Sequence, residues 1–523
     1  MRLARTASLA SVLTVAVGAA PGVAQARPNA APAVVRTDKG LVKGQVREDD
    51  RVFQGIPFAQ PPTGALRWRP PQPARPWTGV YDATSPRSQC AQIAPPYGGQ
   101  STYGEDCLYL NVTTPKTKGA GRGLPVMVWV HGGSNLTGSG SPYDASKLAV
   151  DGGVVVVTVN YRLGPLGWLA HPGLERGADR RYQAGNYGLL DQQAALRWVR
   201  RNIGAFGGDA GNVTLFGESA GAQDTCANLA SPAAAGLFHK AAPQSFACTY
   251  PVRTEASAEA DAVKLAAAVG CGDAPDPAAC LRDVPAKTLL EAFQAAGMNA
   301  GPVAGGDRVL PLQPADAIAK GRFNRVPVLH GSTLDEMRLF VGLAYPQPIT
   351  AARYGEIVRG MFGAAAGEVL ARYPAAAYPD PRIALATIET DFGGPLSTCT
   401  HQDAFGALRR AGVPVYAYQF ADRGAPPLID LPGFDEGAEH ATELTYLFPG
   451  LLGTLTPEQT RLSDAMVAYW TSFARGSRPK APGAPSWPTF RSSGDVLSLA
   501  PGSGGIHPVD TAARSDCAFW NSL

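Results

Sequence analysis

The sequence lacks a pronounced excess of charge of either sign. Its 46 Lys and Arg residues nearly balance its 43 Asp and Glu residues, which gives a formal net charge of +3 at pH 7. No basic run with interleaved aromatic residues occurs. Because nucleic acids and anionic membranes attract proteins through clustered positive charge, we expect no nucleic-acid partner, and nothing in the sequence points to an obligate protein partner.

Apolar runs long enough to cross a membrane are absent beyond the N-terminal segment. A spanning helix needs about 18 consecutive apolar residues, whereas the longest later candidate, residues 154–159, is only as long as a strand. We therefore expect no stable insertion of the chain into a membrane.

Motifs that bind metal ions are also missing. The chain contains no Cys-x-x-Cys motif and no clustered spacing of Cys and His, so we expect neither a metal nor another cofactor. The cysteines fit four disulfides formed in an oxidising compartment. Two pairs enclose short loops, 271 with 280 and 90 with 107, but spacing alone does not determine the pairing. The eight residues are Cys90, Cys107, Cys226, Cys248, Cys271, Cys280, Cys399 and Cys517.

The N-terminal segment has the features of a secretory signal peptide. Arg2 and Arg5 precede an uncharged, mostly apolar run at 7–20, and the tripeptide at 24–26 fits a small-x-small cleavage site. We predict that residues 1–26 are removed and that the mature protein is secreted to the extracellular space. The alanine- and arginine-rich composition of this segment is typical of a bacterial protein.

Nearly continuous apolar runs at 124–130, 154–160 and 213–216 indicate strands buried on both faces, as in a parallel sheet. Between the last two lies an amphipathic helix, predicted over 187–202. Alternation of buried strands with helices favours an α/β fold with a doubly wound, mostly parallel central sheet.

Hydrophobic residues make up 45% of the chain, which is ample for a sizeable core. Large α/β enzymes often run to this length as one unit, so we predict a single domain over 27–523. Further strands are predicted at 326–329 and 413–420. Between them, about residues 337–399, we expect helical insertions packed over the active site as a cap.

A Gly-x-Ser-x-Gly pattern, Gly217 to Gly221, stands between a β-branched strand and a helix predicted over 222–230. In a nucleophile elbow this sharp turn exposes a serine hydroxyl, here Ser219, and places the next amide, that of Ala220, at a helix N-terminus. Five residues alone also fit an ordinary glycine-rich turn, so the rest of the chain must decide.

A serine nucleophile needs a base, and an acid that orients the base. In hydrolases with such an elbow the order is Ser, acid, His. His440 lies in a loop whose Gly437 permits a tight turn, with His401 and His507 as alternatives. Two carboxylates, Asp335 and Glu336, follow the strand predicted at 326–329, and either could orient the imidazole.

The oxyanion of such a reaction requires preorganised backbone amides. His131, Gly132, Gly133 and Ser134 follow the buried strand at 124–130, where the glycine-rich oxyanion loop of esterases belongs. Donors of this kind contribute roughly 3–4 kcal/mol each at the transition state.

Longer segments resemble the type-B carboxylesterase family, which also includes cholinesterases and bile-salt-type lipases. They occur in order over nearly the whole predicted mature chain. The segments are GIPFAQPP at 55–62, EDCLYLNV at 105–112, NYRLG at 160–164, GNYGLLDQ at 185–192 and FGGD at 206–209.

The resemblance implies an α/β-hydrolase fold and a carboxylesterase that cleaves small-molecule carboxylic esters through an acyl-enzyme. It implies Ser219 as nucleophile, His440 as base and Glu336, rather than Asp335, as acid. The implied oxyanion donors are the amides of Gly133, Ser134 and Ala220, with Gly132 shaping the loop.

The resemblance also implies three disulfides, Cys90–Cys107, Cys271–Cys280 and Cys399–Cys517. Cys226–Cys248 has no family counterpart and is predicted only because these two cysteines remain.

Two departures from the family pattern stand near the predicted site. Ser134 replaces a usual third glycine, so its side chain could narrow the acyl site. Ala441 follows His440 where the family commonly has glycine. We expect an esterase acting on short- to medium-chain esters; the alternatives are a lipase or sterol esterase of the same fold, or a non-catalytic binding module.

Overall fold

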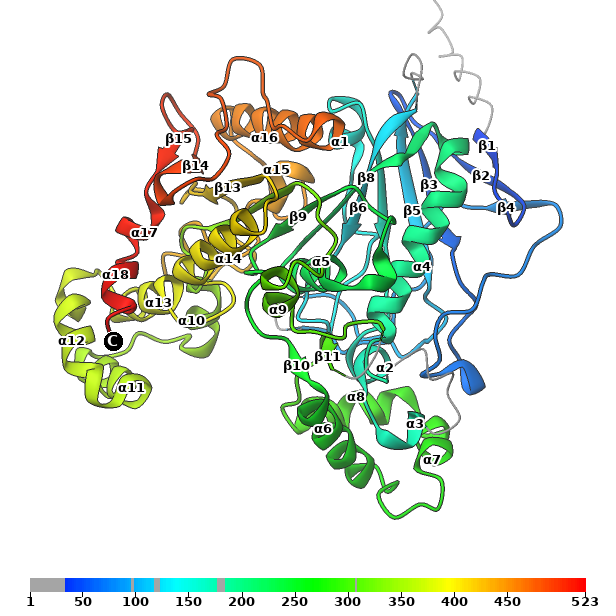
Figure 1. The fold of residues 1–523 in the computed structure, drawn as a ribbon, viewed down its shortest axis with the longest axis horizontal. Helices are drawn as coiled ribbons and strands as arrows, with labels where there is room; N and C mark the ends of the chain where they lie inside the picture. The colour runs from blue at the N-terminus through cyan, green and yellow to red at the C-terminus, as the bar shows by residue number, and fades with distance from the viewer. Residues whose placement is uncertain (1–32, 96–97, 117–122, 176–183, 306–307) are drawn as a thin grey trace, which may run out of the picture. The chain divides into compact units, whose positions relative to one another are not determined.

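The computed structural model describes residues 33–523 except 96–97, 117–122, 176–183 and 306–307 (Figure 1). The predicted signal peptide and its cleavage site lie outside the described residues.

A large mixed sheet forms the centre of the fold (Figure 1). Its outer strands pair antiparallel, whereas the strands from β7 to β14 all pair parallel. The order across the sheet is β1 (Ala33–Arg36), β2 (Leu41–Val46), β3 (Asp50–Pro57), β5 (Tyr109–Pro115), β7 (Val155–Val159), β6 (Leu124–Val130), β8 (Gly208–Glu218), β9 (Lys240–Gln244), β12 (Val328–Thr333), β13 (Val415–Phe420), β14 (Val496–Leu499) and β15 (His507–Val509), with β4 (Val80–Asp82) beside β2.

Helices cover the sheet or extend from it (Figure 1). In chain order they are α1 (Ser146–Val150), α2 (Gly164–Trp168), α3 (Pro172–Glu175), α4 (Tyr187–Asn202), α5 (Ala220–Ala230), α6 (Glu255–Ala268), α7 (Pro277–Asp283), α8 (Ala286–Ala295), α9 (Pro314–Ala319), α10 (Arg338–Ala344), α11 (Ala351–Phe362), α12 (Ala366–Arg372), α13 (Pro381–Asp391), α14 (Thr398–Arg410), α15 (Leu444–Leu447), α16 (Pro457–Gly476), α17 (Thr511–Arg514) and α18 (Cys517–Trp520). The helix at 187–202 and the strand at 124–130 have the predicted bounds.

Side chains of β6 alternate between two apolar cores, one on each face of the sheet. Val126, Val128 and Val130 pack with residues of α4 and α5. Met127 and Trp129 point to the other face and pack with residues of α15 and α16. Each large apolar side chain buried in this way contributes roughly 1.5–3 kcal/mol. Helices on both faces explain why the central strands are continuously apolar.

Two excursions leave the sheet. Between β9 and β12 the chain forms α6 to α9 and the short parallel pair β10 (Arg253–Thr254) and β11 (Val303–Ala304). Between β12 and β13 it forms α10 to α14, in the part of the chain where the sequence predicts a helical cap. The second excursion has a core of its own, in which Trp520 of α18 stacks on Phe392 and Tyr373.

The structure contains four disulfides, of which two close short loops and two join separate segments. Cys90–Cys107 and Cys271–Cys280 close short loops, and Cys226–Cys248 joins α5 to the segment after β9. Cys399–Cys517 joins α14 to α18 across a sequence separation of 118 residues.

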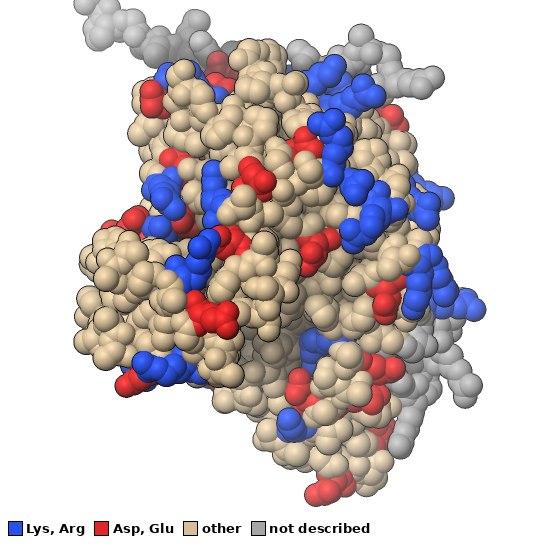
Figure 2. Space-filling model, turned by 60° about the vertical axis from the view of Figure 1, so that its left-hand side comes forward, with Lys and Arg blue, Asp and Glu red and all other residues tan. Residues whose placement is uncertain are grey.

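No helix among the described residues is long and apolar enough to cross a membrane. On the face shown in Figure 2, most of the surface is uncharged, and Lys and Arg side chains follow one another in a band down the upper right of the view.

The long disulfide loop should contribute more stability than the short one. Cross-linking restricts the unfolded chain more when the closed loop is longer. We expect Cys399→Ala/Cys517→Ala, which opens a separation of 118 residues, to lower the free energy of unfolding by about 5 kcal/mol. Cys271→Ala/Cys280→Ala opens a separation of 9 residues and should cost about 3 kcal/mol. Urea titrations of both variants would measure this, and a larger loss for the short loop would contradict it.

Candidate active site

Ser219 stands alone between β8 and α5, in the turn that the sequence predicts. Its φ of +55° is unusual for a residue with a side chain, and its amide donates to the Gln244 carbonyl oxygen at the end of β9 (2.9 Å). A Cβ on Gly221 would lie 2.1 Å from the Val130 carbonyl oxygen, and one on Gly217 would lie 2.6 Å from the same atom. Both flanking glycines are therefore required by the close approach of β6.

The loop after β6 lies beside this turn, because β6 and β8 are neighbours in the sheet. β7 pairs with the other edge of β6, so the strand order reverses here, where α/β sheets commonly open a crevice. Gly133 (φ +100°) and Ser134 (φ +57°) both have left-handed backbones. A glycine adopts such a φ freely, whereas Ser134 adopts it at a cost.

A buried polar network anchors this loop to α5. The Asn135 side-chain amide donates to Gln223 Oε1 (3.2 Å) and to Asp224 Oδ1 (3.3 Å). Burial raises the pKa of the Asp224 carboxyl to about 7, although hydrogen bonds from Gln192 and Asn135 act in the opposite direction. The anchor therefore changes its charge near neutral pH.

Glu336 and His440 are in contact, as the sequence predicts. His440 Nδ1 lies 2.6 Å from Glu336 Oε2, and the Thr333 amide donates to Glu336 Oε1 (2.8 Å). Glu336 follows β12 and His440 lies between β13 and α15. Because β12 and β13 are parallel neighbours, both segments leave the sheet at the same edge.

A second carboxylate, which the sequence analysis missed, faces the other ring nitrogen. His440 Nε2 lies 3.0 Å from Glu218 Oε1, and all three groups are buried. Burial alone lowers the pKa of His440, but the charges of Glu218 and Glu336 outweigh it and raise the pKa well above its ordinary value. Burial likewise raises the pKa of Glu336, but the imidazolium charge outweighs it and the pKa is lowered. The two carboxylates therefore stabilise the cationic form of His440.

A third acid, Glu443, is buried close to this cluster. Burial and the charges of Glu218 and Glu336 raise its pKa well above the ordinary value. Gln244 donates weakly to Glu443 (3.5 Å) and accepts from the Trp470 indole (2.7 Å). No local motif marks these residues, since they meet only through tertiary packing.

Two cavities meet at the oxyanion loop. The first, of about 290 Å³, contains Ser219, His440 and Glu218. The second has a volume of about 340 Å³ and a mainly apolar lining from Leu136, α2 and α8. Gly133 and Ser134 line both, so this loop is a thin wall between them. The apolar residues of the first cavity include Leu339, Phe340, Leu428, Leu444, Leu451 and Leu452.

The alternative residues lie elsewhere. His401 is buried against His330 and Phe405, with Nδ1 2.8 Å from the Ser397 carbonyl oxygen. His507 is exposed on β15. The Asp335 carboxylate is occupied by two arginines rather than by an imidazole. Across the described residues, no group of three or more His, Cys, Asp or Glu side chains is arranged to hold a metal ion.

The chain is similar to known carboxylesterases over most of its length. A model of the Carboxylesterase family matches residues 31–520. Fumonisin B1 esterase of Sphingopyxis macrogoltabida is 36% identical over 487 residues, which cover 90% of this chain and 86% of that protein. Para-nitrobenzyl esterase of Bacillus subtilis is 35% identical over 483 residues, or 87% and 92% of the two chains. A solved PNB esterase structure superposes with a TM-score of 0.75 and 33% identity, covering 92% of this chain and 98% of that one.

The fold and these relatives define a carboxylic ester hydrolase with the predicted α/β-hydrolase fold. The chain belongs to the carboxylesterase family, so the resemblance inferred from its motifs is confirmed.

The raised pKa of His440 depends on Glu218, and this can be measured. Replacing Glu218 by Gln removes a negative charge at 3.0 Å, which favours the neutral imidazole. The pKa of His440 should therefore fall in Glu218→Gln, as followed by NMR titration of ¹³C-labelled histidine. Glu443→Gln is the matched control and should scarcely move the pKa, because Glu443 is not among the groups that raise the pKa of His440; equal shifts in both variants would contradict this electrostatic account.

Proposed function

We propose that the protein is a serine esterase in which Ser219, His440 and Glu336 form the catalytic triad. The observation that carries this proposal is the Glu336–His440 contact of 2.6 Å beside the cavity that contains Ser219. His440 in its neutral form removes the Ser219 proton as the hydroxyl oxygen attacks the ester carbonyl. Glu336 holds the Nδ1–H tautomer and stabilises the imidazolium that forms.

In the resting geometry His440 Nε2 contacts Glu218. Ser219 immediately follows Glu218 and lines the same cavity as His440, so exchange of Glu218 for Ser219 as the partner of Nε2 would complete the triad. We propose that substrate binding brings about this exchange, since hydrogen bonds of catalytic groups often align only in the substrate complex. His440 then protonates the leaving alcohol, and water repeats the sequence to release the acid from Ser219.

The amides of Gly133, Ser134 and Ala220 are the proposed donors to the oxyanion, with Gly132 shaping the loop. Ala220 begins α5, so its amide is among the first four of the helix, which have no partner within it. The helix dipole adds to this effect. Together such donors act only when charge develops on the substrate oxygen.

The size of the cavities supports short- to medium-chain esters as substrates. The volumes of about 290 and 340 Å³ are near the lower end of the range for small-molecule sites. The wall formed by Gly133 and Ser134 would separate the acyl from the alcohol portion. Two relatives are named as esterases of fumonisin B1 and of cocaine, so these two compounds belong among the tested substrates.

Export of the protein is a further part of the proposal. Four disulfides and no free cysteine among the described residues are typical of an oxidising compartment. We propose that residues 27–523 act outside the cell as a single catalytic domain.

Hydrolysis of p-nitrophenyl esters from C2 to C12 tests the nucleophile and the chain-length range together. The parent protein should be most active on the shorter chains, and Ser219→Ala should lose activity by about 10⁴-fold or more. Ser257→Ala, which removes an exposed hydroxyl at the start of α6, should match the parent. A maximum at long chains with activation at a lipid surface would instead indicate a lipase, and full activity in Ser219→Ala would refute the triad.

Substitution of the two neighbouring acids tests which of them orients His440. Glu336→Gln leaves the imidazolium without its partner and should lower kcat by about 10³- to 10⁴-fold. Asp335→Asn should cost far less, because Asp335 does not contact the ring. Steady-state kinetics on p-nitrophenyl butyrate would compare them, and equal losses or the reverse order would contradict the assignment.

A further inference from the structure

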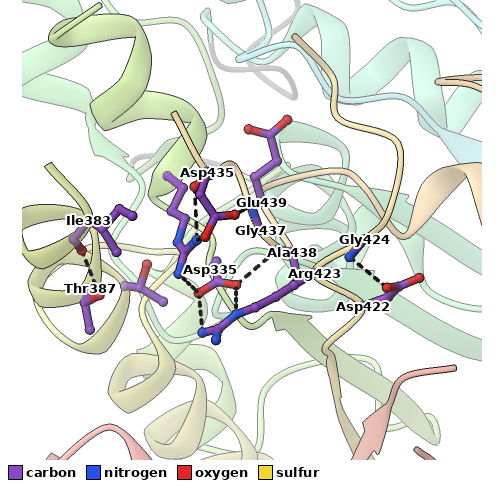
Figure 3. A network of polar contacts seen from close by, with 12 residues as sticks. Asp335, Ile383, Thr387, Asp422, Arg423, Gly424, Asp435, Gly437, Ala438 and Glu439 are labelled. Carbon is purple, nitrogen blue, oxygen red and sulfur yellow. Dashed lines mark hydrogen bonds and ion pairs between the residues drawn. The ribbon is translucent and has the colours of Figure 1, made fainter. Parts of the chain in front are cut away.

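The Asp335 carboxylate has more hydrogen-bond and ion-pair partners than an ordinary surface carboxylate. Arg423 donates to it through both Nε (2.8 Å) and Nη2 (2.9 Å), and Arg338 Nη2 lies 3.1 Å from Oδ1. The Ala438 amide donates to Oδ2 (3.0 Å). Figure 3 shows the carboxylate between the Arg423 guanidinium and the loop that carries Gly437 and Ala438. The side chains of Asp335 and Arg338 are only 7% and 6% exposed, whereas that of Arg423 reaches the surface.

This network connects the same two segments that supply Glu336 and His440. The Asp335 amide donates to the Ala438 carbonyl oxygen (3.0 Å), which completes a reciprocal pair of hydrogen bonds. Ala438 stands two positions before His440, and Asp335 immediately precedes Glu336. The Asp335–Ala438 pair therefore runs beside the Glu336–His440 contact and limits how far the two segments can separate.

Arg338 extends the same connection along the loop. It binds the Asp435 side chain (2.9 Å) and the Asp435 carbonyl oxygen (3.0 Å) as well as Asp335. Gly437 between these contacts has a φ of +58°, and a Cβ there would lie 2.6 Å from Asp335 Oδ2. The loop from Asp435 to Ala438 therefore packs closely around the Asp335 carboxylate.

The backbone after His440 shows why such a constraint is needed. Ala441 has a φ of +72°, a left-handed conformation that costs a residue with a Cβ about 1–2 kcal/mol. A strained residue persists only where its surroundings hold it. On the N-terminal side of His440, the hydrogen bonds and ion pairs of Asp335 keep the backbone in place.

We propose that Asp335 is the positioning residue of His440: with Arg338 and Arg423 it holds residues 435–440 so that the imidazole meets Glu336. This inference rests on the proposed triad. Several charged groups lie near His440 and Asp335. Glu218, Glu336 and Glu443 face the His440 ring, while Asp391 and Arg514 line a cavity of about 110 Å³ beside Asp335.

The test compares Asp335→Asn with the parent by kcat, KM and the pH profile of kcat/KM. A loosened loop lets the imidazole drift from Glu336, so kcat should fall about 10- to 100-fold, as expected for a misplaced catalytic group, with KM nearly unchanged. Separation from the Glu336 charge disfavours the imidazolium, so the pKa of His440 falls. Because the neutral ring is the active form, the acidic limb of the profile should move to lower pH.

Two further variants make the result decisive. Arg423→Gln removes the forked partner of Asp335, and its effect on kcat should not add to that of Asp335→Asn in the double variant, because both act through one network. Glu105→Gln is the matched control: it breaks the forked, part-buried pair with Arg67, which has no contact with His440. It should lower the unfolding temperature while leaving kcat and the pH profile unchanged at temperatures where the protein is folded.

The results distinguish failure of the Asp335 inference from failure of the proposed triad. If Asp335→Asn lowers only the unfolding temperature, as Glu105→Gln does, or lowers kcat without moving the acidic limb, then Asp335 does not position His440 and the inference is wrong. If Ser219→Ala retains activity, the proposed triad itself fails, whatever Asp335 does.

Discussion

The contact of one buried histidine, His440, with two carboxylates is the interaction on which this site depends. Moving a charged ring into a protein interior costs several kcal/mol, and only close opposite charges and hydrogen bonds offset that cost. His440 has both, from Glu336 at 2.6 Å and Glu218 at 3.0 Å. Burial of these charged groups costs free energy. It also makes the distances between them important, because charges in the interior are poorly screened by water.

The sheet provides the rigid frame for this cluster. Glu218 ends β8, Glu336 follows β12, and β9 stands between these strands, so their spacing is set by backbone hydrogen bonds. β9 also reaches the site directly, because the Gln244 carbonyl oxygen accepts from the Ser219 amide. Groups far apart in sequence are thus positioned by strand pairing, while loops only orient their side chains.

Much of this arrangement could be predicted from short-range patterns. Continuous apolar runs located β6 and β7, an amphipathic period located α4 with its observed bounds, and the glycine-flanked serine located the turn after β8. The predicted pair Glu336 and His440 are in contact. These features share a physical origin, because each is a local rule about burial, helix period or backbone space.

What the sequence did not predict depends on contacts between distant segments. β9 carries a lysine and a proline, so its composition does not indicate a strand, yet it lies between β8 and β12. Glu218 gave no signal, because one acid inside an elbow motif is indistinguishable from a solvated one until the His440 ring is placed beside it. The Asp335 network could not be predicted for the same reason: Arg338 begins α10, whereas Arg423 and Ala438 lie in the segment between β13 and α15.

The small core around Trp520 has a consequence for how the protein is made. That tryptophan stacks on Phe392 and Tyr373, and Cys517 of the same helix is bonded to Cys399. During synthesis the helices α11 to α13 leave the ribosome more than a hundred residues before the segment that completes their core. Until then they expose apolar surface, with Cys399 as an unpaired thiol. The nascent chain therefore depends on chaperones that cover this surface. Cys399 must also stay reduced until Cys517 has been synthesised.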